Sequence, residues 1–295
     1  MALALGAATA FAAAPASAFC RSTTCSGDCP RDENGCKITG APLAWPGICV
    51  GFSIQRDGTV NLPMAKVRPA IEAGFVAWSD LDCGAGTASL AFSELDDVTC
   101  HRAEYAEDGP NANIILFQDT RWSYKGADNT LAKTTVTFDT DSGEILDADM
   151  EINHAYNEYT VDDDHVVYDL QSIVAHEVGH FIGLDHSADP DATMFAGYDE
   201  GSTTIRTLEA DDVAAVCAVY PPDRGGDCEP EPKHGLADEC VTEGAGGGAG
   251  EGSGCGIAAG APRGSLIALG LFCLGLVRGP RSRKVGARWG PSRRS

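Results

Sequence analysis

The chain is organised around the stretch His176-Glu177-Val178-Gly179-His180-Phe181-Ile182-Gly183-Leu184-Asp185-His186, which spells H-E-x-x-H-x-x-G-x-x-H. Residues four apart lie on one face of an α-helix, so His176 and His180 can offer imidazole nitrogens to a single metal ion. Glu177 projects beside them and can act as a base. The pattern therefore predicts a helix that carries two zinc ligands and a carboxylate.

Gly183 falls where this helix has to end, because a residue without a Cβ can take a positive φ and turn the chain back. The turn would bring His186 to the metal as a third ligand. Three neutral protein ligands and an open position are typical of catalytic zinc, whereas structural zinc is usually closed by four protein ligands, mostly Cys. Such a zinc lowers the pKa of its water toward ~7, while Glu177 takes the proton and returns it to the leaving amine.

The alternative interpretation is a chance match on an ordinary core helix. A chain of this length carries the extended motif by accident on the order of once in a hundred thousand, so the zinc site is favoured. The motif resembles that of the metzincin zinc peptidases. Within that group, two features resemble the matrixins: Ser187 follows the third histidine, and Ala192-Thr193-Met194-Phe195-Ala196-Gly197-Tyr198 looks like a Met-turn.

The resemblance also implies roles for residues after the motif. Met194 would lie beneath the zinc as a packing floor, and Phe195 to Tyr198 would form a wall of the pocket for the substrate side chain after the scissile bond. Ala196 stands where that wall usually has Pro. An acidic residue of the next helix, Asp211 or Asp212, would support the floor, although a simple charge preference at a helix N-terminus explains it nearly as well.

Apolar residues alternate from Trp45 to Ile54 and then recur every three or four residues from Met64 to Trp78, which predicts a strand followed by an amphipathic helix. Further strands are predicted at residues 88–92, 114–117, 132–139 and 145–152. We expect Asp169 to cap the zinc helix and Thr207 to cap a third helix. Together with the resemblance, these elements predict an α+β metzincin-like domain with a twisted, mainly parallel five-stranded sheet, three main helices and a zinc site in a cleft.

Function follows from the same resemblance, which implies a zinc-dependent endopeptidase acting on protein or peptide substrates. Residues 132–153 resemble the matrixin strands that border the cleft, where an extended substrate is added as a further strand; an ordinary sheet edge is the alternative. Two other functions stay open. The chain could be a catalytically silent zinc-binding surface or adhesion protein, against which the intact Glu177 argues, or a metalloenzyme acting on something other than peptides.

Charge excludes one class of partner. The chain has 43 acidic and 21 basic residues, and seven of the basic ones fall in residues 278–295, which leaves 14 against 43 elsewhere, or −29. Nucleic acid is therefore not an expected partner. Nothing in the sequence indicates an oligomeric state.

The two ends predict export and attachment. Residues 1–18 are Ala-rich and end in an A-x-A-like signal for cleavage after Ala18. A Cys-rich strap at 19–40 would precede the catalytic domain at 41–222, and a Gly, Pro and acid-rich spacer at 223–254 would follow it. The tail, 255–295, resembles the myxobacterial MYXO-CTERM sorting signal; a plain membrane anchor is the alternative, although its uninterrupted apolar core is short of the ~20 residues that span a bilayer. We expect the protein on the extracellular face of the cell envelope, or released from it.

Twelve Cys favour an oxidising location, and the ten outside the tail permit five disulfides. Cys228 and Cys240 are expected to close one local loop, and the region from Cys83 to Cys100 could be bridged locally. The alternatives are a second zinc site at Cys25 and Cys29, or a strap Cys that blocks the catalytic zinc.

Other possible metal ligands give weaker patterns. Asp139, Asp141 and Gly143 have the look of a calcium loop, and residues 162–164 are a second acidic cluster, but Asp is common in turns anyway. Animal matrixins often hold a second, structural zinc with His residues, where this chain has Asp149, so no second zinc is expected. The histidines outside the motif are expected on the surface or in loops: His101, His154, His165 and His234.

Overall fold

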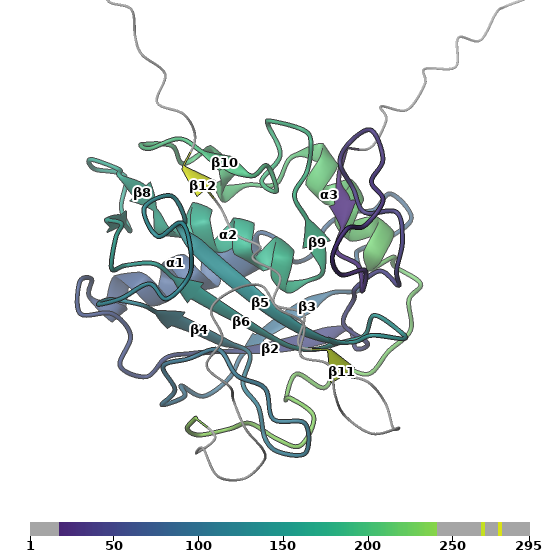
Figure 1. The fold of residues 1–295 in the computed structure, drawn as a ribbon, viewed down its shortest axis with the longest axis horizontal. Coiled ribbons are helices and arrows are strands. Elements are labelled where there is room, and N and C mark those ends of the chain that lie inside the picture. Colours follow the sequence, from purple (N-terminus) through teal and green to yellow (C-terminus); the bar gives the residue numbers. More distant parts are fainter. Residues whose placement is uncertain (1–17, 241–266, 269–276, 279–295) are drawn as a thin grey trace, which may run out of the picture.

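The structure, a computed structural model, describes residues 18–240 and two short strands further along the chain, 267–268 and 277–278 (Figure 1). The predicted signal sequence before Ala18 lies outside the described residues, as do the end of the spacer and all of the tail except those two strands. Among the described residues, no helix is long and apolar enough to cross a membrane.

Five strands form the main sheet in the order β3-β2-β4-β6-β5. They are β2 (Cys49–Ile54), β3 (Ala91–Glu94), β4 (Ile114–Phe117), β5 (Ala132–Asp139) and β6 (Ile145–Ile152). All neighbouring pairs are parallel except β5 and β6, which are antiparallel. The short strand β11 (Ile267–Ala268) pairs with the far end of β5. The predicted α+β architecture with a mainly parallel five-stranded sheet is confirmed.

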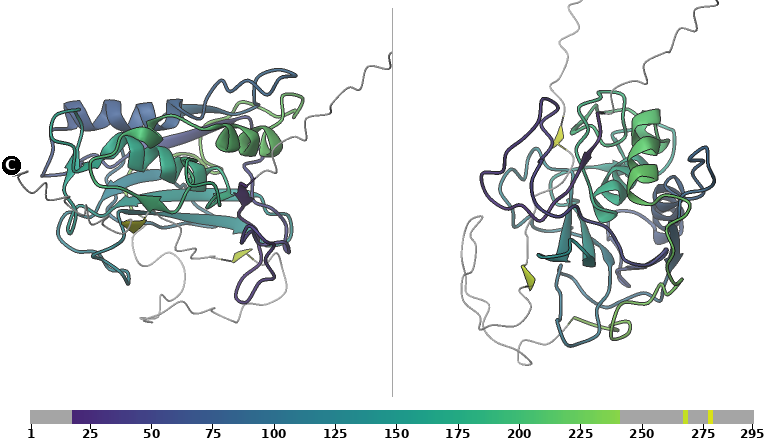
Figure 2. Two further views of the ribbon diagram at one scale, coloured as in Figure 1. Left: turned by 90° about the horizontal axis from the view of Figure 1, so that it is seen from above. Right: turned by 90° about the vertical axis from the view of Figure 1, so that its right-hand side faces the viewer.

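Three α-helices accompany the sheet: α1 (Met64–Val76), α2 (Leu170–Phe181) and α3 (Ala210–Val219). The remaining elements are β1 (Cys20–Arg21) paired with β9 (Leu184–Asp185), β7 (Tyr159–Thr160) paired with β8 (Tyr168–Asp169), β10 (Gly197–Tyr198) paired with β12 (Val277–Arg278), and the 3₁₀-helix η1 (Thr204–Arg206). Figure 2 shows α1 and α2 lying side by side on the same face of the sheet.

Sequence patterns located most of these elements. The strands expected at 114–117, 132–139 and 145–152 have those bounds in the structure. The strand expected at 88–92 begins later, at Ala91, where it pairs with Cys49 of β2. Ala88 and Leu90 are buried in the core without belonging to a strand, so their apolar character reflects packing rather than pairing.

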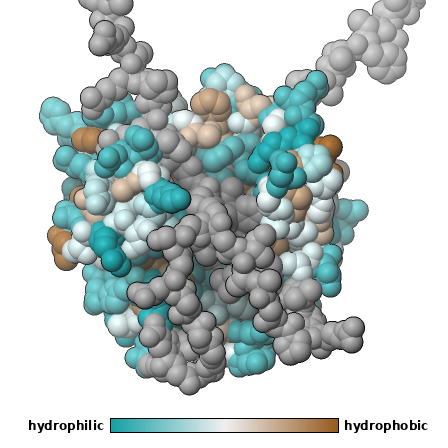
Figure 3. All heavy atoms as spheres, viewed as in Figure 1, coloured by the Kyte–Doolittle hydropathy of each residue, from teal (hydrophilic) through white to brown (hydrophobic). Residues whose placement is uncertain are grey.

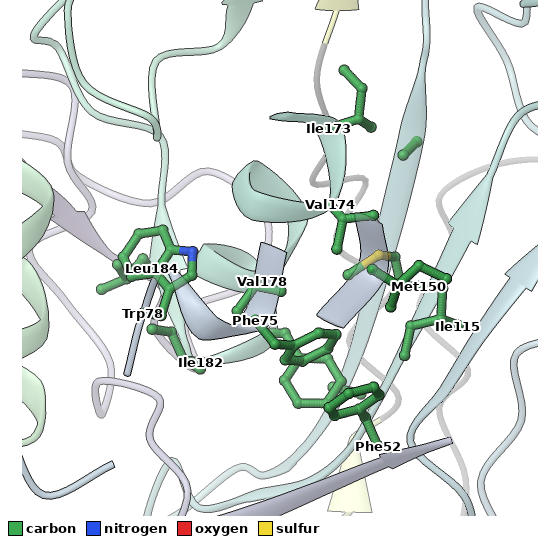
Figure 4. Packing of buried hydrophobic residues seen from close by; sticks show 14 of the residues in the cluster. Phe52, Phe75, Trp78, Ile115, Met150, Ile173, Val174, Val178, Ile182 and Leu184 are labelled. Atoms are coloured by element: carbon green, nitrogen blue, oxygen red, sulfur yellow. The ribbon is translucent and has the colours of Figure 1, made fainter. Parts of the chain in front are cut away.

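The core lies between the sheet and the two helices (Figure 4). Phe75 of α1 stacks on Phe52 of β2 at 3.9 Å between ring centroids and meets Phe181 of α2 edge-on at 5.4 Å. At Gly74 the helices approach so closely that a Cβ would lie 2.5 Å from a methyl carbon of Val174. These contacts fix the zinc helix against both α1 and the sheet.

The opposite face of β5 and β6 is polar yet buried. Lys133 on β5 lies 3.8 Å from Glu151 on β6, and both side chains are 3% exposed. On the same face of β6, burial raises the pKa values of Asp147 and Asp149. The Asp149 carboxylate accepts hydrogen bonds from the backbone amides of Glu104, in the loop before β4, and of Ile114, the first residue of β4. The loop at Glu104 is thereby attached to the sheet by a polar contact.

The surface agrees with the acidic composition. The described residues visible in Figure 3 are mainly hydrophilic. Large exposed apolar side chains in the described part are Ile38, Val60, Val76 and Tyr156.

Disulfide pairing differs from the expected local loops. The described residues form five bridges: Cys20–Cys36, Cys25–Cys29, Cys49–Cys228, Cys83–Cys217 and Cys100–Cys240. The predicted Cys228–Cys240 loop is therefore wrong, and so is a local bridge between Cys83 and Cys100. The reason is that residues 226–240 run back along the domain, where the Ala237 amide bonds to the Asn111 carbonyl at 3.0 Å.

The four cysteines of the strap form disulfides with one another. Cys25 and Cys29 are bridged to each other, and Cys20 is bridged to Cys36, so none of the four is a free thiolate for a metal. Both alternatives that gave a strap Cys a zinc-binding role are thus excluded. The strap instead joins the domain through β1, which pairs with β9 directly before the third histidine of the motif.

We predict that the double substitution Cys100→Ala/Cys240→Ala lowers the free energy of unfolding by up to about 5 kcal/mol, because the bridge closes a loop 140 residues in length. Urea denaturation of the oxidised proteins measures the change. If the two cysteines were instead unpaired, the double variant would unfold at the same urea concentration as the wild type.

Candidate active site

The helix that carries the motif begins as the sequence predicts. Asp169 is its N-cap, and the Asp169 carboxylate accepts a hydrogen bond from the Ser172 amide at 2.9 Å. Arg206 of η1 donates two further bonds to the same carboxylate, at 2.8 and 2.6 Å. Asp169 is fully buried, so the pair fixes the start of α2 within the domain.

Three histidines come together at the other end of α2. One ring nitrogen of each of His176, His180 and His186 lies within 4.8 Å of the other two. Gly183 makes this possible, because its φ of +91° turns the chain out of the helix. A Cβ at Gly183 would also lie 2.6 Å from the carbonyl oxygen of Leu43, so a larger residue would strain the turn and collide with the backbone at Leu43.

Backbone carbonyls orient two of the three imidazole rings. His176 Nδ1 lies 2.7 Å from the Thr193 carbonyl oxygen, and His180 Nδ1 lies 3.0 Å from that of Leu184. A carbonyl can only accept, so Nδ1 carries the proton on both rings and Nε2 keeps its lone pair. Both Nε2 atoms are buried and have no hydrogen-bond partner in the described part of the chain.

Electrostatics keep these rings uncharged. Burial, aided by the neighbouring His186, lowers the pKa of His176 to about 3 and the pKa of His180 well below its usual value. Neutral imidazoles with directed, otherwise unused Nε2 lone pairs are the donors that zinc prefers. The residues present therefore fit a zinc ion with three histidine ligands.

A turn beneath the helix supports the ligands. Met194 is 1% exposed, and its Sδ packs directly against Gly179 of α2, in the space that a Cβ there would need. The backbone amides of Thr193 and Met194 donate to the two carboxylate oxygens of Asp212 at 2.8 and 3.1 Å. Since the Thr193 carbonyl holds His176, Asp212 indirectly orients a ligand.

Asp212 thus fulfils the floor-supporting role that was open between it and Asp211. Asp211 instead accepts from the Ser187 hydroxyl at 2.7 Å and from the Ala18 amide at 2.8 Å. The expected cap at Thr207 is wrong, because the helix starts two residues later. Glu209 is the N-cap and forms a reciprocal capping box with Asp212. The sequence Glu-x-x-Asp is therefore the pattern that indicates the start of this helix.

Glu177 lies beside the histidines and is fully buried. The Thr134 hydroxyl, on the neighbouring strand β5, donates to Glu177 Oε2 at 2.7 Å. Sequence analysis did not single out Thr134 or Arg206, since only the folded chain brings them to α2.

Comparison with known proteins agrees with this geometry. The family model described as matrixin matches residues 45–221, more than half of the chain. The chain belongs to the matrixin family. One relative is matrix metalloproteinase-C of Caenorhabditis elegans, which is 26% identical over 63% of this chain and 31% of that protein. Human neutrophil collagenase is 25% identical over 64% of this chain and 36% of its own length. Metalloendoproteinase 1-MMP of Arabidopsis thaliana is 28% identical over 60% of this chain and 44% of that protein. The chain thus spans 31% to 44% of the length of these relatives.

Matrixins use a catalytic zinc, and the donor set at the three histidines fits that metal. Matrixins commonly bind calcium as well. In this chain the Asp139 carboxylate accepts hydrogen bonds from the backbone amides of Ser142 and Asp141 at 2.8 and 3.0 Å. These bonds lower the pKa of Asp139 and stabilise the turn that follows it. Asp162 and Asp163 of the second acidic cluster pair with Lys66 and Arg206.

Tyr198, the last residue of the expected matrixin pocket wall, is buried at the start of α2. Its hydroxyl accepts from the Asp169 amide at 3.1 Å and donates to the Ser202 carbonyl. Burial raises the pKa of Tyr198 to about 12. The segment after the Met-turn is therefore anchored to the N-cap of the zinc helix.

One histidine outside the motif, His154, lies in a turn between β6 and β7, as expected, but its side chain is buried. His154 is 9% exposed, lies 2.9 Å from the Thr59 hydroxyl and 3.5 Å from Asp119, and has a lowered pKa because of burial. His154 is the second residue after β6 and packs edge-on against Tyr159, which its polar sequence neighbours did not indicate.

We predict that the metal-free protein loses stability as pH falls. His176 has a folded pKa of about 3 and an unfolded pKa near 6.5, so the unfolded state binds more protons between these values. The contribution is intact above pH ~6.5 and is lost at up to about 1.4 kcal/mol per pH unit below it. Thermal melts between pH 7.5 and 5 measure this. The variant His176→Gln should show a shallower dependence, and equal slopes would contradict the prediction.

We predict that Asp212→Asn lowers the free energy of unfolding by about 2 to 3 kcal/mol, because the amide NH₂ must face a backbone donor. Zinc affinity should fall about tenfold or more, since the carbonyl that orients His176 moves with the turn. Chelator competition and denaturation measure the two effects. Asp211→Asn is the matched control, and an equally large loss of zinc affinity there would show that Asp212 has no special role.

Proposed function

We propose that this chain is a zinc-dependent endopeptidase that is exported and attached to the cell envelope. One observation carries the catalytic part: the buried His176 and His180 and the half-buried His186 each bring a ring nitrogen within 4.8 Å of the other two. Glu177 follows His176 on the same helix. Zinc bound there would supply Lewis-acid chemistry, lowering the pKa of a water toward ~7 and polarising the scissile carbonyl.

Each residue has a role in this proposal. His176, His180 and His186 hold the metal as neutral ligands, and Gly183 and Met194 hold the ligands in place. Glu177 takes a proton from the attacking water while the oxygen bonds to the carbonyl carbon. The carboxyl group then returns that proton to the amine nitrogen as the carbon–nitrogen bond breaks. No covalent bond to the protein is needed.

The substrate would bind along β5. This strand is the last of the five main strands, and within the described residues 132–137 have only β6 as a partner strand. An extended peptide could add to such an edge through main-chain hydrogen bonds. Tyr198 would then end the wall of the pocket for the residue after the cleaved bond. A protein or peptide is thus the proposed substrate class.

Attachment and domain limits are part of the proposal. Five disulfides favour an oxidising compartment. The signal sequence 1–18 would direct export, 41–222 would be the catalytic domain, and the tail 255–295 would attach the protein to the envelope or be cut near Cys255. Calcium bound by surface carboxylates remains a secondary proposal.

The test uses the exported, purified chain with casein as substrate. We expect cleavage that stops with a chelator, returns with zinc, and is lost in Glu177→Ala although this variant still holds one zinc. The zinc content separates loss of the base from loss of the metal.

A catalytically silent surface protein is the competing function. If the wild-type chain binds one zinc and cuts neither casein nor any member of a broad peptide library, that function replaces ours. Cleavage of small amides or esters alone would instead indicate a metalloenzyme with a different substrate.

A further inference from the structure

Strand β5 presents a regular pattern to the zinc helix. Residues that alternate along a strand share one face, and on β5 that face carries Ala132, Thr134, Val136 and Phe138. All four are 2% exposed or less. Thr134 is the polar member of this otherwise apolar row, so its hydroxyl must have a partner in the interior.

The partner is the carboxylate of the proposed base. Thr134 Oγ1 lies 2.7 Å from Glu177 Oε2 and 3.3 Å from the Glu177 backbone carbonyl oxygen. A hydroxyl has one proton to donate, and the shorter contact, to the side-chain oxygen, forms the stronger bond. Both residues are fully buried, and a hydrogen bond in such an interior is stronger than one in water.

Both partners are rigidly mounted. Thr134 is β-branched, which restricts its χ1 angle, and it sits opposite Met150 in the regular β5–β6 register. Glu177 is in the last two turns of α2, a helix fixed at its start by Asp169 and along its length by the core. The distance between the hydroxyl and the carboxylate is therefore set by the packing of the strand against the helix.

We propose that Thr134 is a positioning residue for the reaction, which holds the Glu177 carboxylate in the orientation that proton transfer requires. This inference rests on the proposed peptidase function. With Oε2 accepting from Thr134, the plane of the carboxylate is fixed about its Cγ–Cδ bond. Oε1 then takes the proton as the O–H bond of water breaks, and the same oxygen releases it to the leaving amine.

The test compares substitutions at Thr134 in the zinc-loaded full chain. Thr134→Val keeps the shape and removes the donor, whereas Thr134→Ser keeps the donor. We expect Thr134→Val to lower kcat about tenfold or more, with KM changed less than twofold, and Thr134→Ser to stay within about threefold of wild type. Zinc content should remain one per chain in both. Thr134→Ala replaces the valine variant if that protein does not fold.

A second readout does not depend on turnover. Acetohydroxamate chelates zinc and bonds to an adjacent carboxylate, so calorimetry should show several-fold weaker binding to Thr134→Val than to wild type. In a Glu177→Gln background, adding Thr134→Val should change this affinity little, because the interaction is already altered. Equal additional losses in both backgrounds would overturn the inference.

Met150→Val is the matched control. It removes packing volume directly opposite Thr134, and we expect a lower melting temperature with kcat within twofold of wild type. If Met150→Val lowers kcat as much as Thr134→Val does, the role of Thr134 is packing and the inference fails. If the wild type cleaves no peptide, the proposed function fails first, and acetohydroxamate binding still decides whether Thr134 positions Glu177.

Discussion

Two hydrogen bonds from imidazole Nδ1 atoms to backbone carbonyls are the interactions on which this site depends. The acceptors are Thr193 and Leu184, and both follow the helix that carries His176 and His180. The two histidines that we propose as metal ligands are therefore correctly oriented only after the chain has turned at Gly183 and the Met-turn has packed against the helix. Folding of the C-terminal part of the domain and formation of the metal site are one event, because the same contacts serve both.

A second constraint comes from the sheet. The helix face of β5 has to be apolar to pack on α2, while the opposite face contains Lys133 and pairs it with Glu151. The alternation of a strand meets both demands in eight residues. Thr134 is the one departure from the apolar row, and it is the side chain that reaches the carboxylate beside the metal ligands. A polar residue that interrupts the apolar pattern thus marks the contact for which we propose a functional role.

Sequence patterns were most informative where a local rule decides the structure. The motif spacing located the ligands, Asp169 has the features of an N-cap, and alternation delimited β5 and β6. Tertiary contacts decided the rest. Cys228 and Cys240 pair with the distant Cys49 and Cys100 rather than with each other. Strand β3 begins where its partner strand permits, and His154 is buried by residues far away in sequence. Thr134 looks like an ordinary strand residue until the helix is packed against it.

The most direct test of the account is X-ray absorption at the zinc edge of the purified chain. The structure predicts a first shell of three imidazole nitrogens at about 2.0 to 2.1 Å and one further oxygen at a similar distance, with no sulfur. Loss of one nitrogen in His186→Ala would identify the third ligand. A shell with sulfur at about 2.3 Å, or with four protein ligands, would contradict the assignment of this site as an open, catalytic metal centre.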